Sequence, residues 1–170
     1  MSKKIAILVD ESYQVLEVWY PLYRLREEGF EVVTIGNGTR DTFPSKEGYP
    51  CRVDCSIEKV SAKDFDAVVI PGGWAPDFLR RYPKIVQFVK DLNAGGKVVA
   101  SICHGGWMLV SADCCKGKRA TCFLSVKDDI IAAGAKYVDE ETVVDGNLIT
   151  ARKPDDLPAF VKAIIQKLQS

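Results

Sequence analysis

The sequence predicts a single α/β domain in which a doubly wound, mostly parallel sheet lies between two layers of helices. Short apolar runs alternate with helical patterns along the chain, as strand and helix units do in such a sheet. One apolar run, residues 98–102, ends abruptly at Cys103, His104 and two glycines, which is typical of a buried strand that turns sharply into a helix. A chain of 170 residues is long enough to bury one core, so we expect one domain over residues 1–170.

The first elements follow from apolar spacing. Residues 5–9 are a continuous β-rich run and predict the first strand, and apolar residues spaced by three and four predict a helix over 15–28. Pro21 interrupts this helix because proline lacks an amide hydrogen, so the helix either starts late or bends there. Gly29 is expected to cap it, and residues 30–35 predict the second strand.

The next segment, residues 36–48, is polar and rich in turn formers. We expect an excursion at the sheet edge, with short, exposed strand pieces at 42–43 and 49–54. A buried strand over 65–70 closes at a turn of one proline and two glycines. The remaining predicted elements are a helix at 83–94, the central strand at 97–102, a short strand near 122, a helix at 125–133, strands at 137–138, 142–144 and 148–150 with a hairpin between the last two, and a final helix at 157–168.

Composition excludes several classes of function. The 23 lysines and arginines balance 23 aspartates and glutamates, so the chain has no net charge to recruit nucleic acid or an anionic membrane surface. We therefore expect a small neutral substrate or a protein partner. The amino terminus lacks the pattern of a secretory leader, and no apolar run approaches the roughly 20 residues that span a bilayer, so we expect a soluble, cytoplasmic protein.

Six cysteines occur in this mid-sized chain, and reduced thiols are favoured over disulfides because no export signal is recognised. A structural zinc site is not expected, since the chain has one histidine and no Cys-x-x-Cys pair. We expect neither a metal nor another cofactor.

Cys103 is the candidate nucleophile. Parallel sheets bind ligands outside the carboxyl ends of their strands, and three turns reach that edge, after Val9, Ile70 and Ile102. A thiol at a helix N-terminus is expected to have a depressed pKa and hence more thiolate at neutral pH. His104 is the only imidazole, so a cysteine–histidine pair uses this neighbour or a histidine of another subunit.

Four glycines accompany this edge. Gly105 and Gly106 are expected to let a substrate approach the backbone closely. Gly72 and Gly73 arrive at the same edge, where their N–H groups could stabilise a developing oxyanion. The alternatives remain a simple glycine turn and, for Cys103, a small buried apolar residue.

Three stretches carry a resemblance to a known family: the strand and glycine turn at 65–77, the cysteine elbow at 100–105, and the hairpin and helix entrance at 143–157. In this order, and over nearly the whole chain, they closely resemble the PfpI family. That family lies within the ThiJ/PfpI superfamily of glutamine-amidotransferase-like folds. The resemblance implies a flavodoxin-like sheet with a cysteine nucleophile elbow.

The resemblance also implies roles for four residues. Cys103 is the nucleophile, His104 is its neighbour in the site, and Glu17, four residues before Pro21, is the carboxylic acid that approaches the sulfur. Two adjacent negative charges would raise both pKa values, so Glu17 is expected to be protonated and to donate a hydrogen bond. Asp77 matches a carboxylate that reaches the histidine across a subunit interface, which implies a homodimer or hexamer. For both acids the alternative is a solvated helix residue.

The neighbourhood of the site has further candidates and two departures from the family pattern. Gln14 stands where many members carry a second glutamate, which puts any mechanism with two acids on that segment in doubt. Gly106 replaces a common proline, which is expected to loosen the backbone and to widen the pocket or alter its mobility. The candidate pocket walls, which could equally be core aromatics, are Tyr20, Trp74, Trp107 and Phe123.

The family is associated with intracellular peptidase activity, with deglycation of methylglyoxal- or glyoxal-modified groups, and with glyoxalase conversion of methylglyoxal to lactate. The resemblance therefore implies a cofactor-free, cysteine-dependent hydrolase or lyase that acts on 2-oxoaldehydes or their protein adducts in stress protection. Two alternatives stay open: an oligomeric cysteine peptidase, and a non-catalytic stress protein whose thiol senses oxidation. The expected partners are a small aldehyde or glycated amino or thiol substrate, peptides, and a second copy of the chain, but no specific nucleic acid and no membrane.

Overall fold

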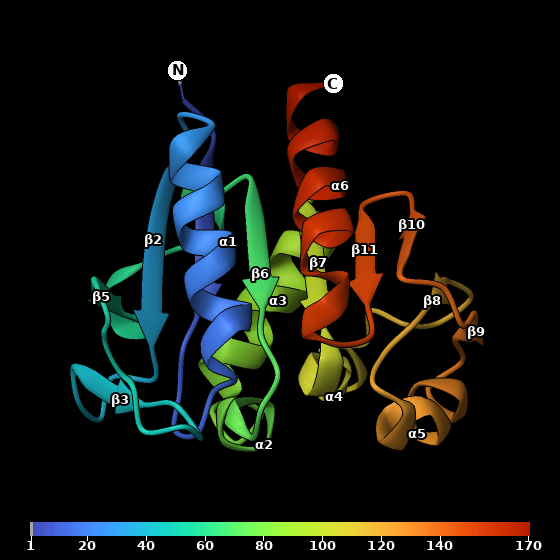
Figure 1. Cartoon of the computed structure of the whole chain (residues 1–170), viewed down its shortest axis with the longest axis horizontal. Helices are drawn as coiled ribbons and strands as arrows, with labels where there is room; N and C mark the ends of the chain where they lie inside the picture. Colours follow the sequence, from blue (N-terminus) through green and yellow to red (C-terminus); the bar gives the residue numbers. More distant parts are fainter. Residues whose placement is uncertain (1) are drawn as a thin grey trace.

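A computed structural model describes residues 2–170. Within this range the main sheet has seven strands in the order β10-β11-β7-β6-β1-β2-β5 (Figure 1). Neighbouring strands run parallel except β10 and β11, which form an antiparallel pair. The predicted mostly parallel sheet is thus confirmed. The strands are β1 (Lys4–Leu8), β2 (Glu31–Gly36), β5 (Cys55–Ser56), β6 (Ala67–Ile70), β7 (Val98–Ile102), β10 (Thr142–Asp145) and β11 (Leu148–Ala151).

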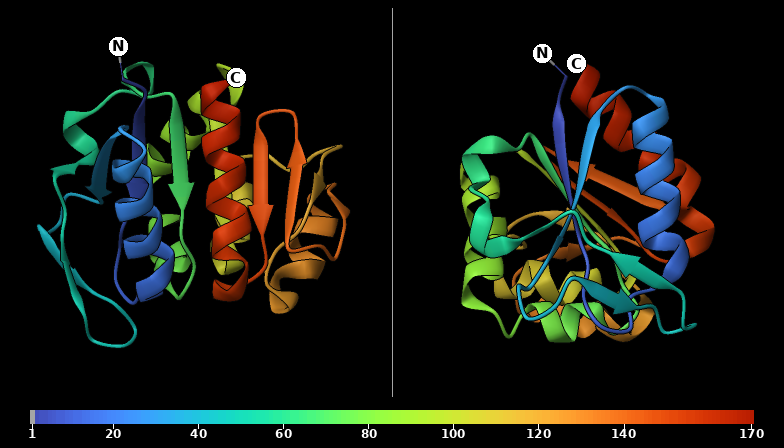
Figure 2. Two further views of the ribbon diagram at one scale, coloured as in Figure 1. Left: turned by 45° about the horizontal axis from the view of Figure 1, so that its top comes forward. Right: turned by 90° about the vertical axis from the view of Figure 1, so that its left-hand side faces the viewer.

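Helices cover both faces of this sheet. Helices α1 (Val15–Glu27) and α6 (Leu157–Gln169) pack against each other on one face, and α3 (Pro83–Ala94) packs against β6 and β7 on the other. The end-on view in Figure 2 separates the two layers. Three short helices gather near the carboxyl ends of the strands (Figure 1): α2 (Ala75–Leu79), α4 (Gly106–Ser111) and α5 (Lys127–Ala132).

The core explains why the central strands were predictable. Strands β6 and β7 are buried along their whole length, and β1 is buried from Ile5 onward. A strand covered by helices on both faces carries apolar residues at every position, so it is visible in the sequence as a continuous apolar run. The hairpin between β10 and β11 is also confirmed, with Asp145 paired to Leu148. Among residues 2–170, none of the helices combines the length and apolar character needed to cross a membrane.

Helix α1 begins at Val15 and continues through Pro21, so of the two outcomes expected at this proline the late start does not occur. The side-chain oxygen of Gln14 caps the helix by accepting hydrogen bonds from the N–H groups of Leu16 (2.7 Å) and Glu17 (3.2 Å). This cap places Glu17 in the first turn. Gly29 follows the helix at a φ of +87°, a conformation that favours glycine, as its predicted capping role requires.

The edge excursion contains both predicted strand pieces, but not all of their residues are exposed. Strands β3 (Thr42–Pro44) and β4 (Pro50–Arg52) form a separate antiparallel ribbon. The ribbon is not simply exposed, because Phe43 and Cys51 are buried beneath it. The strand β5 was not predicted, since two residues are too few to show a pattern, and neither was the short helix α2 before α3. A second small pair, β8 (Arg119–Ala120) with β9 (Lys136–Tyr137), is parallel.

Candidate active site

The cysteine elbow forms as the sequence predicts. Strand β7 ends at Ile102, Cys103 opens a short 3₁₀ turn, and α4 follows. Cys103 has a φ of +61°, the left-handed region that residues with a Cβ rarely adopt, so the turn holds the nucleophile candidate under backbone strain. Cys103 is buried, with 6% of the residue exposed. The elbow therefore presents the thiol at the floor of a site rather than on the open surface.

The glycines of the elbow serve packing rather than substrate approach, which corrects our expectation. A Cβ at Gly105 would lie 2.7 Å from the Ile70 carbonyl oxygen and 2.7 Å from Ser101 Oγ, so the absence of a side chain lets the turn sit against the ends of β6 and β7. A Cβ at Gly106 would meet the side chain of Cys122 at 3.2 Å. Gly106 therefore packs toward α5, where a Cβ would also meet Ile130 at 3.3 Å, and it does not line the pocket.

Glu17 reaches the elbow from α1. Its side chain is fully buried, and Oε2 accepts a hydrogen bond of 2.6 Å from the N–H of Gly72. A Cβ at Gly72 would lie 2.7 Å from both Cys103 Cβ and Glu17 Oε2, so this glycine allows the acid and the thiol to approach each other. The Gly72 N–H is therefore already used by Glu17, which leaves Gly73 as the glycine whose N–H can face an oxyanion.

Burial sets the charges of the acid and the thiol. It raises the pKa of Glu17 to about 7, because the interior disfavours the carboxylate. Burial also raises the pKa of Cys103, and the charge of Glu17 raises it further. Hydrogen bonds from the N–H groups of His104 and Gly73 to the sulfur lower the pKa of Cys103. The expected depressed thiol pKa is thus wrong: desolvation and the neighbouring acid outweigh the helix N-terminus.

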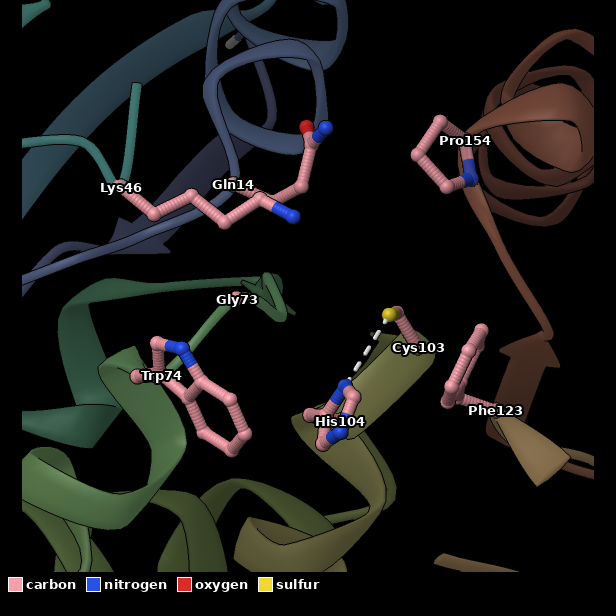
Figure 3. A pocket seen from close by; sticks show the side chains of 8 residues that line it. All are labelled: Gln14, Lys46, Gly73, Trp74, Cys103, His104, Phe123 and Pro154. Carbon is pink, nitrogen blue, oxygen red and sulfur yellow. Dashed lines mark hydrogen bonds between the residues drawn. The ribbon is translucent and has the colours of Figure 1, made fainter. Parts of the chain in front are cut away.

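His104 lies beside the sulfur. Its Nδ1 is 3.4 Å from Cys103 Sγ (Figure 3). Its Nε2 is 3.2 Å from Ser125 Oγ. Burial lowers the pKa of His104, and the charge of Lys46 lowers it further, so the ring is neutral at pH 7. In the tautomer with hydrogen on Nε2, that nitrogen donates to Ser125 and Nδ1 is free to accept the thiol proton.

Aromatic side chains fix the imidazole ring. Phe123 stacks on His104 with ring centres 5.0 Å apart, Trp107 meets it edge-on at 5.2 Å, and Trp74 lies at 5.4 Å. Trp107 packs behind the histidine and its indole N–H donates to Asp129, so it supports the pocket without lining it.

The resulting pocket has a volume of about 150 Å³. Tyr20 lies elsewhere, on an exposed part of α1 beside Leu16 and Tyr23, which corrects its predicted place in the pocket. Lys46 and Pro154 were missed, because they come from a loop and a helix entrance that only the folded chain brings to this edge. The lining residues, labelled in Figure 3, are Gln14, Lys46, Gly73, Trp74, Cys103, His104, Phe123 and Pro154.

Asp77 does not reach the histidine within one chain. It lies on α2, is about half exposed, and forms an ion pair with Arg81 one helical turn later. The six cysteines are all free thiols. Across residues 2–170, no group of three potential metal-ligating side chains gathers in one place.

The buried Glu17 predicts a pH-dependent stability. Its pKa is about 7 in the folded chain against a model-compound value of 4.5, so between these pH values the folded state binds a proton that the unfolded state has lost. The free energy of unfolding should therefore fall by about 3 kcal/mol as pH rises through this window. In Glu17→Gln, whose amide mimics the protonated acid, this pH-dependent contribution should vanish. Chemical unfolding at pH 4.5 and at pH 8 measures the difference.

The control is Glu27→Gln, an exposed acid at the end of the same helix. Asp10, whose pKa burial raises to about 6, contributes to both proteins and cancels in the comparison. If the free energy of unfolding changed equally with pH in the wild type and in Glu17→Gln, burial would not hold the Glu17 carboxyl group neutral.

Comparisons with known proteins match this fold and this sequence. The sequence profile described as the DJ-1/PfpI family matches residues 3–167. A deglycase from Pyrococcus horikoshii is 41% identical over 166 residues, covering 98% of this chain and 99% of that protein. A Bacillus subtilis protein, whose name proposes a cysteine protease, is 40% identical over 169 residues, covering 99% of this chain and 100% of that protein.

A solved structure agrees with these relatives. It is a two-domain protein from Anabaena variabilis that contains a DJ-1/ThiJ/PfpI-like domain and a ferritin-like domain. It is 43% identical, superimposes with a TM-score of 0.96, and covers 99% of this chain, which spans about half (48%) of that protein. The resemblance that the motifs carry is thereby confirmed over nearly the whole length, and the chain belongs to the DJ-1/PfpI family.

Proposed function

We propose that this protein is a cofactor-free, cysteine-dependent enzyme of deglycase or glyoxalase type, acting on 2-oxoaldehydes or their adducts with amino and thiol groups. The observation that carries the proposal is the convergence of Cys103 and a neutral His104 at one small pocket, with Glu17, whose pKa burial raises to about 7, buried behind Gly72 against the thiol. A relative named deglycase, 41% identical over nearly the full length, supports the same type of activity.

The three groups match the proton transfers that such a reaction needs. The thiol proton passes to His104, and the sulfur adds to the aldehyde carbon while the carbonyl electron pair moves to oxygen and takes a proton. With an adduct, the amine or thiol leaves with a proton as sulfur takes its place. The Gly73 N–H faces the developing oxyanion.

An internal redox step then follows without an external oxidant. A base removes the proton from the sulfur-bearing carbon, and the neighbouring ketone carbon gains a proton through an enediol. The first carbon is oxidised by two electrons and the second is reduced by two, which gives a thioester of a 2-hydroxy acid. Water cleaves the thioester, releases lactate from methylglyoxal, and restores the Cys103 thiol.

The test is a substrate panel with purified protein. Lactate should form from methylglyoxal and from methylglyoxal-modified N-acetyl-lysine, while unmodified peptides stay intact. Peptide fragments without lactate would favour a peptidase, the function that the name of the Bacillus subtilis relative proposes. If neither product forms but mild peroxide converts Cys103 to a sulfinate, the protein is a redox sensor and the enzyme proposal is wrong.

We also propose that a second copy of the chain supplies Asp77 to His104. The support is its exposed position on α2 and the family resemblance, while Ser125 is the partner of His104 Nε2 within one chain. Asp77→Asn should then lower turnover about 10²-fold, and dilution of the wild type, which separates the copies, should lower its specific activity. Ser125→Ala is the matched variant: if it, and not Asp77→Asn, lowers turnover, the histidine is oriented within one chain.

A further inference from the structure

Lys46 is the only charged side chain among the eight residues that line the pocket. It lies in the loop between β3 and β4, and its backbone N–H donates a 2.9 Å hydrogen bond to the Tyr13 carbonyl. The neighbouring Ser45 also bridges to Tyr13, so the loop is fastened to the segment before α1. Figure 3 shows the Lys46 side chain extending toward the opening that Cys103 and His104 line from the other side.

The charge of Lys46 is poorly neutralised by the protein. Within the described residues its ammonium has one ion-pair contact, to Glu47 Oε1 at the long distance of 3.8 Å. The other oxygen of Glu47 accepts a hydrogen bond from the N–H of Val15 at the start of α1. Lys46 also lowers the pKa of both Glu17 and His104, so its positive field reaches the reacting groups.

Gln14 adds a second donor beside it. The side-chain oxygen of Gln14 is occupied as the cap of α1, which leaves its amide N–H groups for a ligand. No carboxylate lines the pocket, because Glu17 is buried behind Gly72. The polar groups that face the pocket are therefore mainly donors, and one of them is positively charged.

We propose that Lys46 and the Gln14 amide form a subsite for a substrate carboxylate, so that the preferred substrates are carbonyl compounds or adducts with a carboxylate a few atoms from the reacting carbon. This proposal rests on the proposed function of Cys103 as nucleophile. It departs from the small neutral substrate that the balanced composition predicts, because a net charge of zero for the whole chain does not describe the charge at one pocket.

The test compares two alkylating reagents of nearly equal size. Iodoacetate carries a carboxylate and iodoacetamide a neutral amide, and both react at a thiol with loss of iodide. The measured quantity is the ratio of their rate constants at Cys103, followed by mass spectrometry. In Lys46→Met the ratio of iodoacetate to iodoacetamide should fall about fivefold, the size of one charge pair near a protein surface. Taking the ratio removes any general change in thiol reactivity.

Two variants serve as controls. Lys46→Arg keeps the positive charge and should keep most of the preference for iodoacetate. Lys84→Met removes the same charge from α3, where the ammonium pairs with Glu58 outside the pocket, and should leave the ratio unchanged. An equal ratio in the wild type and Lys46→Met would overturn the subsite.

The outcomes separate this proposal from the proposed function, because alkylation requires a thiol but no turnover. A Lys46-dependent ratio without lactate formation would support the subsite and contradict the enzyme. If neither reagent reaches Cys103, NMR spectra of isotopically labelled protein test directly whether the pocket binds a carboxylate. The amides of Gly73 and His104 should shift with pyruvate but not with methyl pyruvate, and should no longer shift in Lys46→Met. No shift with pyruvate in the wild type would overturn the subsite.

Discussion

Substitution of Cys103 by serine should lower the turnover of methylglyoxal adducts by at least about 10³-fold, because a covalent nucleophile acts as a unit with its proton acceptor. A serine hydroxyl loses its proton far less readily than a thiol and is a weaker nucleophile toward a carbonyl. Serine has nearly the same size, so it should accept the left-handed backbone of the elbow and leave folding intact. Steady-state kinetics and a thermal unfolding curve on the same preparation measure both effects.

The control for loss of a thiol is Cys51→Ser. Cys51 is buried in β4 and does not line the pocket, so this variant should retain turnover. Undiminished activity in Cys103→Ser would falsify the covalent mechanism. A loss shared equally by both variants would point to general destabilisation instead.

The second large effect is expected at Gly73. Its φ is +66°, and an added Cβ would lie 2.5 Å from the Gln14 nitrogen and 2.5 Å from the Ser12 carbonyl oxygen, both of them backbone atoms. Gly73→Ala should therefore destabilise the fold by about 3 to 4 kcal/mol, combining left-handed strain with overpacking. Turnover should also fall, because the N–H that faces the Cys103 sulfur moves. Denaturant unfolding measures the first effect.

Gly96→Ala isolates the backbone-strain part of this effect, so the difference between the two variants measures the steric part. Gly96 has a nearly identical φ of +68°, but a Cβ there would meet nothing within 4 Å. Its substitution should therefore cost about 1 kcal/mol, from left-handed strain alone. Equal destabilisation by the two variants would show that close backbone contact at Gly73 is not what the site depends on.

The sequence predicted the helices and strands that show a local pattern, such as periodic apolar residues or a glycine at the end. Helix α3 was placed at its observed bounds, since apolar spacing and a terminal glycine mark it, and β7 was placed within one residue. Strand β5 and helix α2 were missed, because they owe their conformation to neighbours in the fold. Pro21 illustrates the same limit: a local rule predicted interruption, but the buried face of α1 against the sheet holds the helix together.

The sequence could predict those residues of the site that are neighbours along the chain. Cys103 and His104 are adjacent in sequence, so their proximity was visible at once. Glu17 required the family resemblance, since nothing local shows that an acid in a first helical turn is buried. Lys46 gave no signal, because a lysine in a polar loop is ordinarily solvated. The direction of the Cys103 pKa also depended on burial, which only the folded chain defines.

The proline inside α1 bears on protein engineering. Residue 21 would normally donate its N–H to the carbonyl of residue 17, so Pro21 leaves the backbone of Glu17 without its helical partner. The residue whose side chain approaches the nucleophile thus has a backbone carbonyl that accepts no hydrogen bond from residue 21. Selection for thermostability that lets position 21 vary will favour residues that restore this bond. Such variants gain a helical hydrogen bond at Glu17, so selection for stability acts directly on the backbone of the acid beside the nucleophile.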